Sequence, residues 1–130
     1  MTLPDNLRYT KEHEWILLHD DGTATIGITD FAQSELGELV YVEIDTVGEE
    51  INKDEVFGTV EAVKTTSDLF MPVTAKVLEF NPELNEDEGD NPGIINEDPY
   101  GAGWIVKIQL SNPEEINELL TSETYGELIA

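Results

Sequence analysis

Cysteine is absent from the sequence of 130 residues. Its absence excludes disulfides, thiolate nucleophiles, and zinc or iron–sulfur sites with cysteine ligands. The remaining side chains carry out no disulfide redox chemistry of their own. A protein of this composition therefore takes part in such chemistry only through an attached prosthetic group.

Cations are scarce as well, because six Lys and Arg stand against 29 Asp and Glu and the formal net charge is −23. Lys and Arg make most contacts with nucleic-acid phosphates and with anionic membranes, and here they are scattered along the chain. We expect no nucleic-acid partner and no membrane binding, but a monomer steered towards basic partner surfaces. The six cations are Arg8, Lys11, Lys53, Lys64, Lys76 and Lys107.

Long apolar runs are also missing, and the longest apolar run in the sequence is too short to span a bilayer. The first nine residues lack the basic and apolar stretches of a signal peptide. We therefore expect a cytoplasmic protein, or a protein of the mitochondrial matrix if a leader has been removed. With 39% hydrophobic residues, a chain of this length is expected to form one domain, over residues 1–130, with an ordinary core.

A β-hairpin is the clearest local signal. Residues 13–18 and 23–28 are rich in strand formers, and the turn sequence Asp20-Asp21-Gly22 separates them. Similar short segments alternate with turn signals along the chain, which is typical of a sandwich or flattened barrel. These further strands are predicted over residues 39–44, 55–63, 74–80 and 104–110, with a gap over 64–68 that is followed by the apolar residues 69–71.

Two of these strands carry predictions about burial. Residues 39–44 are almost entirely apolar on both faces, which predicts a strand that is buried on both sides. Trp104, Val106, Ile108 and Leu110 alternate with polar residues, so they are expected to share one buried face.

A short helix is predicted over about 30–36, with Asp30 as N-cap, Gln33 three residues later and Gly37 at the end. Residues 81–100 are rich in proline, glycine and acids, which predicts a loop with at most one helical turn.

A second helical segment is predicted over about 112–128, as an amphipathic helix followed by a shorter one. Asn112 is expected to cap it, with Pro113 in the first helical position. Its inward-facing residues are expected to be Ile116, Leu119 and Leu120, and Leu36 of the first helix is also interpreted as core.

The many carboxylates form no recognisable metal site. Residues 85–90 resemble a calcium loop in composition, but an EF-hand needs glycine at its sixth position and Asp90 stands there. His13 and His19 have no third ligand at a useful spacing. We expect no bound metal.

Lys64 is the one distinctive residue, because it lies between two predicted strands, at or near the tip of a hairpin. On position alone, a lysine there is a solvated charge. However, the sequence around it resembles the lipoyl-attachment hairpin of the glycine cleavage system H proteins, and other motifs agree in order over about 7–128. The resemblance is carried by Val60 to Asp68, His13-Glu14-Trp15, Gly27 to Gln33, Asn96 to Gly101 and Gly103-Trp104.

This resemblance implies a mainly β, hybrid barrel-sandwich fold in one lipoyl-carrier domain, with the lysine-bearing hairpin over about 55–80. It implies lipoic acid joined to Lys64 through an amide, in a carrier that is not itself an enzyme. The implied partners are four enzymes. A pyridoxal-phosphate-dependent glycine decarboxylase loads the aminomethyl group, a tetrahydrofolate-dependent aminomethyltransferase removes it, dihydrolipoyl dehydrogenase reoxidises the dithiol, and another enzyme attaches lipoate.

The same resemblance points to acids near the lysine. Glu14 and Asp68 are candidates for a groove that cradles the amine-bearing arm. Glu61 is a candidate for recognition by the lipoate-attaching enzyme. The resemblance implies histidine in many relatives where this chain has Phe31 and Glu35, which puts a pH-dependent role at these two positions in doubt.

Four alternatives stay open. A biotin carrier has methionines on both sides of its lysine, whereas Val63 and Thr65 flank Lys64 here. An H-like protein that relays lipoyl groups to other complexes fits the same sequence. In a cofactor-free acidic interaction module, Lys64 remains a free amine. An intrinsic enzyme fits least, since no base or oxyanion donor is identifiable around Lys64.

Overall fold

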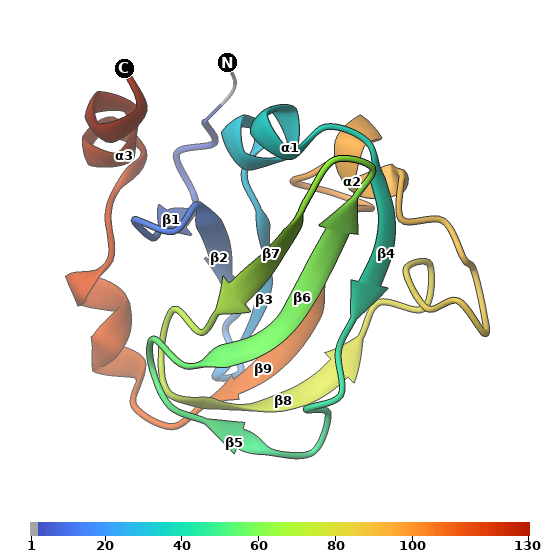
Figure 1. Ribbon diagram of the computed structural model, residues 1–130. Coiled ribbons are helices and arrows are strands. Elements are labelled where there is room, and N and C mark those ends of the chain that lie inside the picture. Colours follow the sequence, from blue (N-terminus) through green and yellow to red (C-terminus); the bar gives the residue numbers. More distant parts are fainter. Residues whose placement is uncertain (1–2) are drawn as a thin grey trace.

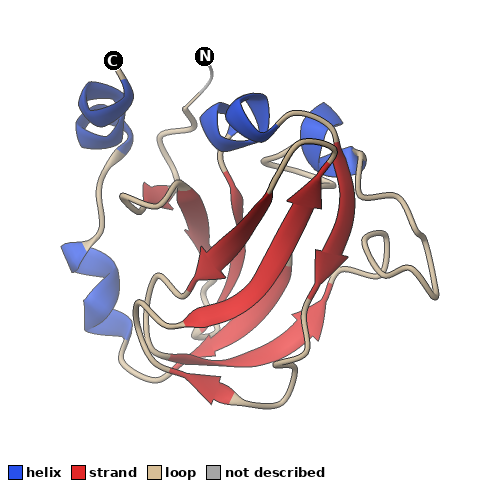
Figure 2. Ribbon diagram, in the orientation of Figure 1, coloured by secondary structure: helices blue, strands red, loops and turns tan. Residues whose placement is uncertain are grey.

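The computed structural model describes residues 3–130 as two antiparallel sheets that enclose the core (Figures 1 and 2). The larger sheet has the strand order β1-β2-β3-β9-β8-β5 and the smaller has the order β4-β6-β7. The larger sheet comprises β1 (Arg8–Tyr9), β2 (Glu14–Leu18), β3 (Thr23–Ile28), β9 (Val106–Leu110), β8 (Ala75–Phe80) and β5 (Glu50–Ile51), and the smaller comprises β4 (Leu39–Glu43), β6 (Val56–Ala62) and β7 (Thr66–Phe70).

The predicted hairpin of β2 and β3 is confirmed, with Trp15 opposite Gly27 in its register. β3 also pairs with β9, which in turn pairs with β8, so the middle of the large sheet joins segments far apart in the sequence. The segment 55–80 therefore divides between the sheets. β6 and β7 form a hairpin in the small sheet, whereas β8 crosses to the large one.

The predicted gap over residues 64–68 is wrong in its second half, because β7 already begins at Thr66. Thr66 pairs with Glu61, and the amide of Ala62 donates to the carbonyl of Thr65 at 2.7 Å. The loop of the hairpin is therefore only three residues long, with Lys64 at its centre.

The prediction that residues 39–44 are buried on both sides is also wrong. Leu39 and Val42 are buried, but Val40 is 44% exposed. β4 is an edge strand, and its pairing with β6 contains an irregularity between Leu39 and Tyr41 that turns the intervening side chain outward.

Two groups of buried side chains stabilise the fold. The larger lies between the sheets and contains Ile26, Phe57, Val60 and Ile108 among others. The smaller lies outside the large sheet, beneath the C-terminal segment, and consists of Leu7, Tyr9, Trp15 and Tyr125. Val106, Ile108 and Leu110 share a buried face as predicted, whereas Trp104 precedes β9, is partly buried and packs against the smaller group.

Helix α1 (Asp30–Leu36) forms where the sequence predicts it, but its N-cap is Thr29, one residue before the predicted Asp30. The Thr29 hydroxyl accepts from the amide of Ala32, while Asp30 instead accepts from the Gln33 side chain inside the helix. Gly37 ends the helix with a φ of 82°, a conformation that favours glycine.

The 81–100 segment contains one helical turn, α2 (Ile94–Glu97), as predicted, and it fixes α1 in place. The Asn96 amide donates to the carbonyl of Gly37 and to the side chain of Gln33, and its oxygen accepts from the amide of Leu39. The hydroxyl of Tyr100 accepts from the amide of Asp30. Both ends of α1 are thus held by this segment.

The C-terminal segment also follows the prediction, except in helix type. Asn112 caps η1 (Pro113–Glu118), which is a 3₁₀ helix, and α3 (Ser122–Ile129) follows. Ile116 is buried in the larger group of core residues. Leu119 is partly buried against the larger group and Leu120 against the smaller one. Among residues 3–130, no helix combines the length and the apolar character needed to cross a membrane.

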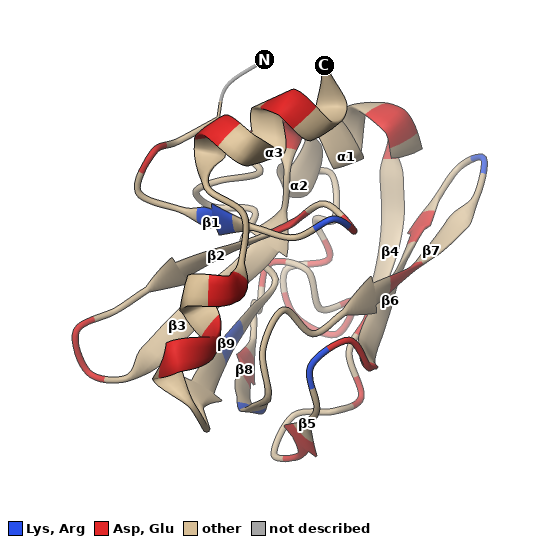
Figure 3. Ribbon diagram, turned by 90° about the vertical axis from the view of Figure 1, so that its left-hand side faces the viewer, with Lys and Arg blue, Asp and Glu red and all other residues tan. Residues whose placement is uncertain are grey.

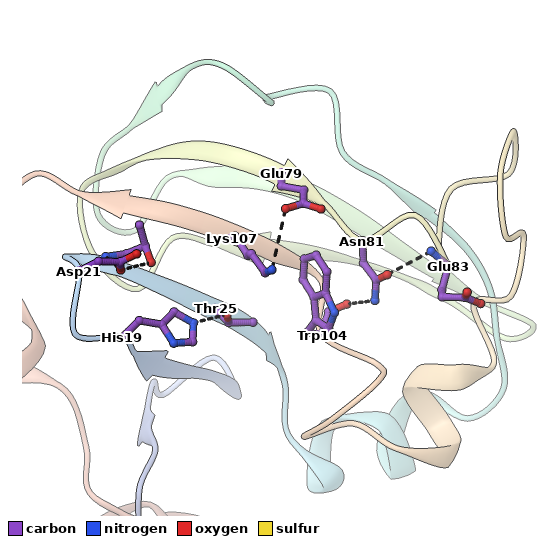
Figure 4. Close-up of polar contacts among 9 residues, drawn as sticks. His19, Asp21, Thr25, Glu79, Asn81, Glu83, Trp104 and Lys107 are labelled. Carbon is purple, nitrogen blue, oxygen red and sulfur yellow. Dashed lines mark hydrogen bonds and ion pairs between the residues drawn. The ribbon is translucent and has the colours of Figure 1, made fainter.

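Several side chains on one part of the large sheet make polar contacts with one another (Figure 4). His19 Nε2 lies 2.7 Å from the hydroxyl of Thr25 on the neighbouring strand. Lys107 Nζ lies 5.0 Å from the centre of the Trp104 ring and 3.9 Å from a Glu79 oxygen. His19 therefore has a hydrogen-bonding partner on β3.

Candidate functional site

Lys64 lies at the tip of the β6–β7 hairpin, exposed to solvent. Seen from the side, this hairpin projects from the body of the molecule and its tip carries the lysine, while most charged positions elsewhere are acidic (Figure 3). Within the part of the chain that the structure describes, both ion pairs are formed by other lysines, Lys53 and Lys107. The Lys64 amine is thus free to react.

A pocket of about 400 Å³ lies between α1 and the β6–β7 hairpin, and we call it the α1–β7 pocket. One wall comes from α1, the opposite wall from β7, and the base from the start of β2. At about 3.3 Å per residue, Ser67 and Asp68 lie only about 10–13 Å along the strand from Lys64. The residues that line the pocket include Glu12, His13, Glu14, Phe31, Glu35, Leu36, Ser67 and Asp68.

Glu14 lies at the base of the pocket, with only 2% of its surface exposed. One carboxylate oxygen accepts from the Thr10 hydroxyl at 2.6 Å and the other from the backbone amide of Phe70 at 3.2 Å. Burial raises the pKa of Glu14 to about 7, although these two hydrogen bonds favour the ionised form. The carboxyl group therefore changes charge near neutral pH.

Asp68 lies in the same pocket as Glu14, but it is exposed on the rim. It comes from β7, opposite Thr59 of β6. Glu61, the third candidate acid, is also exposed, but it lies on β6 near the hairpin tip and does not line the pocket. The structure therefore brings two of the three candidate acids together and separates the third.

The α1 side of the pocket combines an aromatic ring with a carboxylate. The Phe31 ring lies 5.0 Å from the His13 ring, centre to centre, and Glu35 stands one turn further along the helix. These are the two positions where the family resemblance implies histidine in many relatives. In this chain the wall is therefore apolar at Phe31 and acidic at Glu35.

Leu36 lines the pocket and is only partly buried, so its interpretation as a core residue holds only in part. Three further contributions were not predicted from the sequence, namely those of Thr10, the Phe70 amide and Tyr125, whose hydroxyl lies 2.8 Å from His13 Nδ1. The spacing of Thr10 four residues before Glu14 was the one local signal available.

No metal site is found in residues 3–130, in the sense that no three His, Asp or Glu side chains gather there as potential ligands. The acids of the α1–β7 pocket instead surround a space open to solvent, which suits an organic cation attached to an apolar chain. The site thus combines an exposed hairpin lysine with a neighbouring pocket that has acidic and apolar walls.

The architecture is the barrel-sandwich fold of lipoyl carrier domains, which confirms the predicted fold class. The crystal structure of a glycine cleavage system H protein from Mycobacterium marinum matches it with a TM-score of 0.84 and 38% sequence identity, over 95% of this chain and 96% of that one.

A family model described as "Glycine cleavage H-protein" matches residues 7–130, and the chain belongs to this family. It is 53% identical to the glycine cleavage system H protein of Chlorobium limicola, over 99% of this chain and 98% of the relative. It is 49% identical to that of Salinibacter ruber, over 98% and 99%. The resemblance seen in the sequence is thereby confirmed.

Proposed function

We propose that this chain is the lipoyl carrier of the glycine cleavage system, with lipoic acid joined to Lys64 through an amide. The bound group supplies a disulfide that accepts a one-carbon amine unit together with two electrons. The proposed cycle uses the glycine decarboxylase, the aminomethyltransferase and dihydrolipoyl dehydrogenase. The observation that carries this proposal is the exposed Lys64 at the hairpin tip, in a chain of the H-protein family.

The hairpin suits the attachment of a long arm. Antiparallel pairing from Thr59 with Asp68 to Glu61 with Thr66 holds the base of the loop, so the position of Lys64 is defined while its side chain is exposed. Because amide formation removes the charge of the lysine, the loaded chain is about one charge more negative. Tethering also raises the effective concentration of the reactive group at each partner's site.

The α1–β7 pocket suits the amine-bearing end of this arm. Asp68 on the rim can accept a hydrogen bond from an ammonium group, whereas both oxygens of Glu14 already accept hydrogen bonds from the protein. We therefore assign the direct contact to Asp68. Glu14 contributes negative charge when ionised and holds β7 against β2. The apolar side chains of Phe31 and Leu36 exclude water from the arm.

Glu61 has a different proposed role. It lies on the exposed face of β6, three residues before Lys64 and outside the pocket, where an attaching enzyme reaches it together with the lysine. The strongly acidic surface favours enzymes that present basic surfaces around their active sites.

The test is a reconstituted exchange assay that follows labelled carbon dioxide entering glycine in the presence of glycine decarboxylase. The lipoylated chain should support exchange, and the K64R variant, which keeps the charge and the fold, should not. If K64R supports exchange as well as the wild type, the proposal is wrong. If the lipoylated wild type is inactive with the decarboxylase but transfers lipoyl groups to other acceptor proteins, the relay alternative replaces it.

A further inference from the structure

The hydroxyl group of Tyr125, in the C-terminal helix α3, connects two parts of the pocket wall. It lies 2.8 Å from His13 Nδ1 and 2.8 Å from the hydroxyl of Thr29, the N-cap of α1. His13 lines the α1–β7 pocket, so a chain of hydrogen bonds runs from the start of α1 through Tyr125 to the pocket.

Tyr125 is held rigidly at this junction. It is fully buried, and its ring stacks on that of Tyr9 with a centroid distance of 4.8 Å and an interplanar angle of 10°. Burial raises the pKa of Tyr125 to about 12, so its hydroxyl keeps its proton at neutral pH. Tyr125 therefore donates a single hydrogen bond, either to Thr29 or to His13.

The hydrogen of the Thr29 hydroxyl decides whether Tyr125 donates to Thr29 or to His13. The Thr29 hydroxyl is fully buried and already accepts from the amide of Ala32. In the described residues, the only remaining partner of its own hydrogen is the oxygen of Tyr125. A buried hydroxyl hydrogen without an acceptor is costly, so Thr29 donates to Tyr125 and Tyr125 donates to His13 Nδ1.

His13 is consequently neutral, with its hydrogen on Nε2. No buried, unpaired side-chain nitrogen or oxygen is found in residues 3–130, and Nε2 makes no hydrogen bond there, so this nitrogen is open to solvent. The backbone holds the residue as well. His13 has a φ of 72°, and its amide and carbonyl are hydrogen-bonded to Thr10 and Thr29.

We propose that Tyr125 is a positioning residue, which fixes His13 as the neutral tautomer with an Nε2–H donor in the α1–β7 pocket. The inference rests on the proposed function, since it concerns the wall against which the amine-bearing arm would lie. A neutral ring does not repel an ammonium group, whereas an imidazolium would. The C-terminal helix thereby sets the charge of a pocket formed by distant parts of the chain.

Burial and the neighbouring carboxylates act on the protonation of His13 in opposite directions, and burial has the larger effect. Glu12 in the same loop and Glu35 on α1 favour protonation of the ring, and Glu14 of β2 and Asp68 of β7 line the same pocket. Burial opposes protonation and lowers the pKa of His13 below its usual range. Tyr125 opposes it too. An imidazolium has a hydrogen on Nδ1 and would donate it to the Tyr125 oxygen. Tyr125 would then donate to Thr29, and the hydrogen of the Thr29 hydroxyl would have no acceptor.

The first test uses NMR on the unmodified chain and needs no cofactor. Long-range ¹H–¹⁵N spectra should show His13 with its hydrogen on Nε2, and Y125F should lose this preference and raise the pKa of His13. Y9F is the matched control, because Tyr9 belongs to the same stack but its hydroxyl donates to the carbonyl of Pro4. His19 serves as the internal reference, and thermal unfolding checks that each variant is folded.

The second test uses the lipoylated, amine-loaded protein and follows release of the amine. Y125F should release it several-fold faster than wild type at about pH 6, where its His13 is more often protonated, with little difference at about pH 8. Y9F should behave as wild type. If His13 of the wild type carries its hydrogen on Nδ1, or if its tautomer is the same in Y125F, the proposed series of hydrogen bonds is wrong. This result does not depend on lipoylation. A changed tautomer with unchanged release overturns the positioning role and leaves Lys64 attachment untouched.

Discussion

Glu14 of β2 accepts a hydrogen bond from the backbone amide of Phe70 in β7, at 3.2 Å, and so joins the two sheets at one edge of the sandwich. The two residues are 56 positions apart in the sequence. Because the same carboxyl group lies at the base of the α1–β7 pocket, the protonation of Glu14 affects both the contact between the sheets and the charge of the pocket.

The pH dependence of folding should reveal this group. Burial raises the pKa of Glu14 from 4.5 to about 7, so between these values the folded protein holds a proton that the unfolded chain has released. The resulting stabilisation is fully present below pH 4.5 and is lost as the pH rises through about 7. Its size is about 3 kcal/mol for a group so deeply buried.

E14Q provides the measurement, because glutamine keeps the size of the side chain but does not titrate. Denaturant unfolding from about pH 5 to 8 should show a smaller loss of stability in E14Q than in wild type, since the other carboxylates contribute equally to both. Parallel curves for the two proteins would contradict the burial-driven shift.

Asp68 and Glu61 offer a matched pair of substitutions on the same hairpin. D68N should speed release of the arm-bound amine about two- to fivefold, as expected for one exposed carboxylate, and leave the rate of lipoylation unchanged. E61Q should slow lipoylation and leave amine release unchanged. Rates of both reactions in both variants provide the check. The assignment is wrong if the two effects are exchanged.

The packing of Trp15 on Gly27 should tolerate no side chain. A Cβ atom at Gly27 would lie 2.6 Å from the Trp15 ring, whose Nε1 donates to the carbonyl of Pro99. G27A should therefore destabilise the protein by about 1–3 kcal/mol and change the tryptophan fluorescence. G126A is the control, because a Cβ there meets only the end of the Leu3 side chain, at 3.3 Å, and alanine in a helix gains up to about 1 kcal/mol. Equal stability of G27A and wild type would show that Trp15 is free to move.

Salt should stabilise this protein. The net charge is −23, and among residues 3–130 there are only two ion pairs, at 3.5 and 3.9 Å. Screening therefore weakens repulsion among carboxylates more than it weakens attraction. The melting temperature should rise between about 10 mM and 500 mM sodium chloride. A fall over this range would mean that ion pairs dominate the surface electrostatics.

Local patterns in the sequence were sufficient to predict most strands and the position of Lys64. The alternation of residues 23–28 and the turn before them depend on neighbours in the chain, and the same holds for the hairpin around Lys64. The exposed face of β4 was missed, because an edge position and a strand irregularity follow from pairing with β6 and leave no mark on an apolar run.

The role of Lys64 came from the family resemblance and not from its position, since a hairpin lysine is usually only a solvated charge. Only some of the residues that form the pocket could be predicted from the sequence. Glu14 and Asp68 were named as candidates, but the contact of Tyr125 with His13 joins residues 112 positions apart. Such pairings are decided by how the C-terminal helix packs on the sheet, and no local spacing encodes them.

The most direct test of the lipoyl-carrier proposal is the intact mass of the protein purified from its own host, with the modified peptide mapped. Lipoylation should add about 188 Da on the peptide that contains Lys64, whereas biotin would add about 226 Da. An unmodified chain from cells replete in lipoate would contradict the proposal and favour a cofactor-free interaction module.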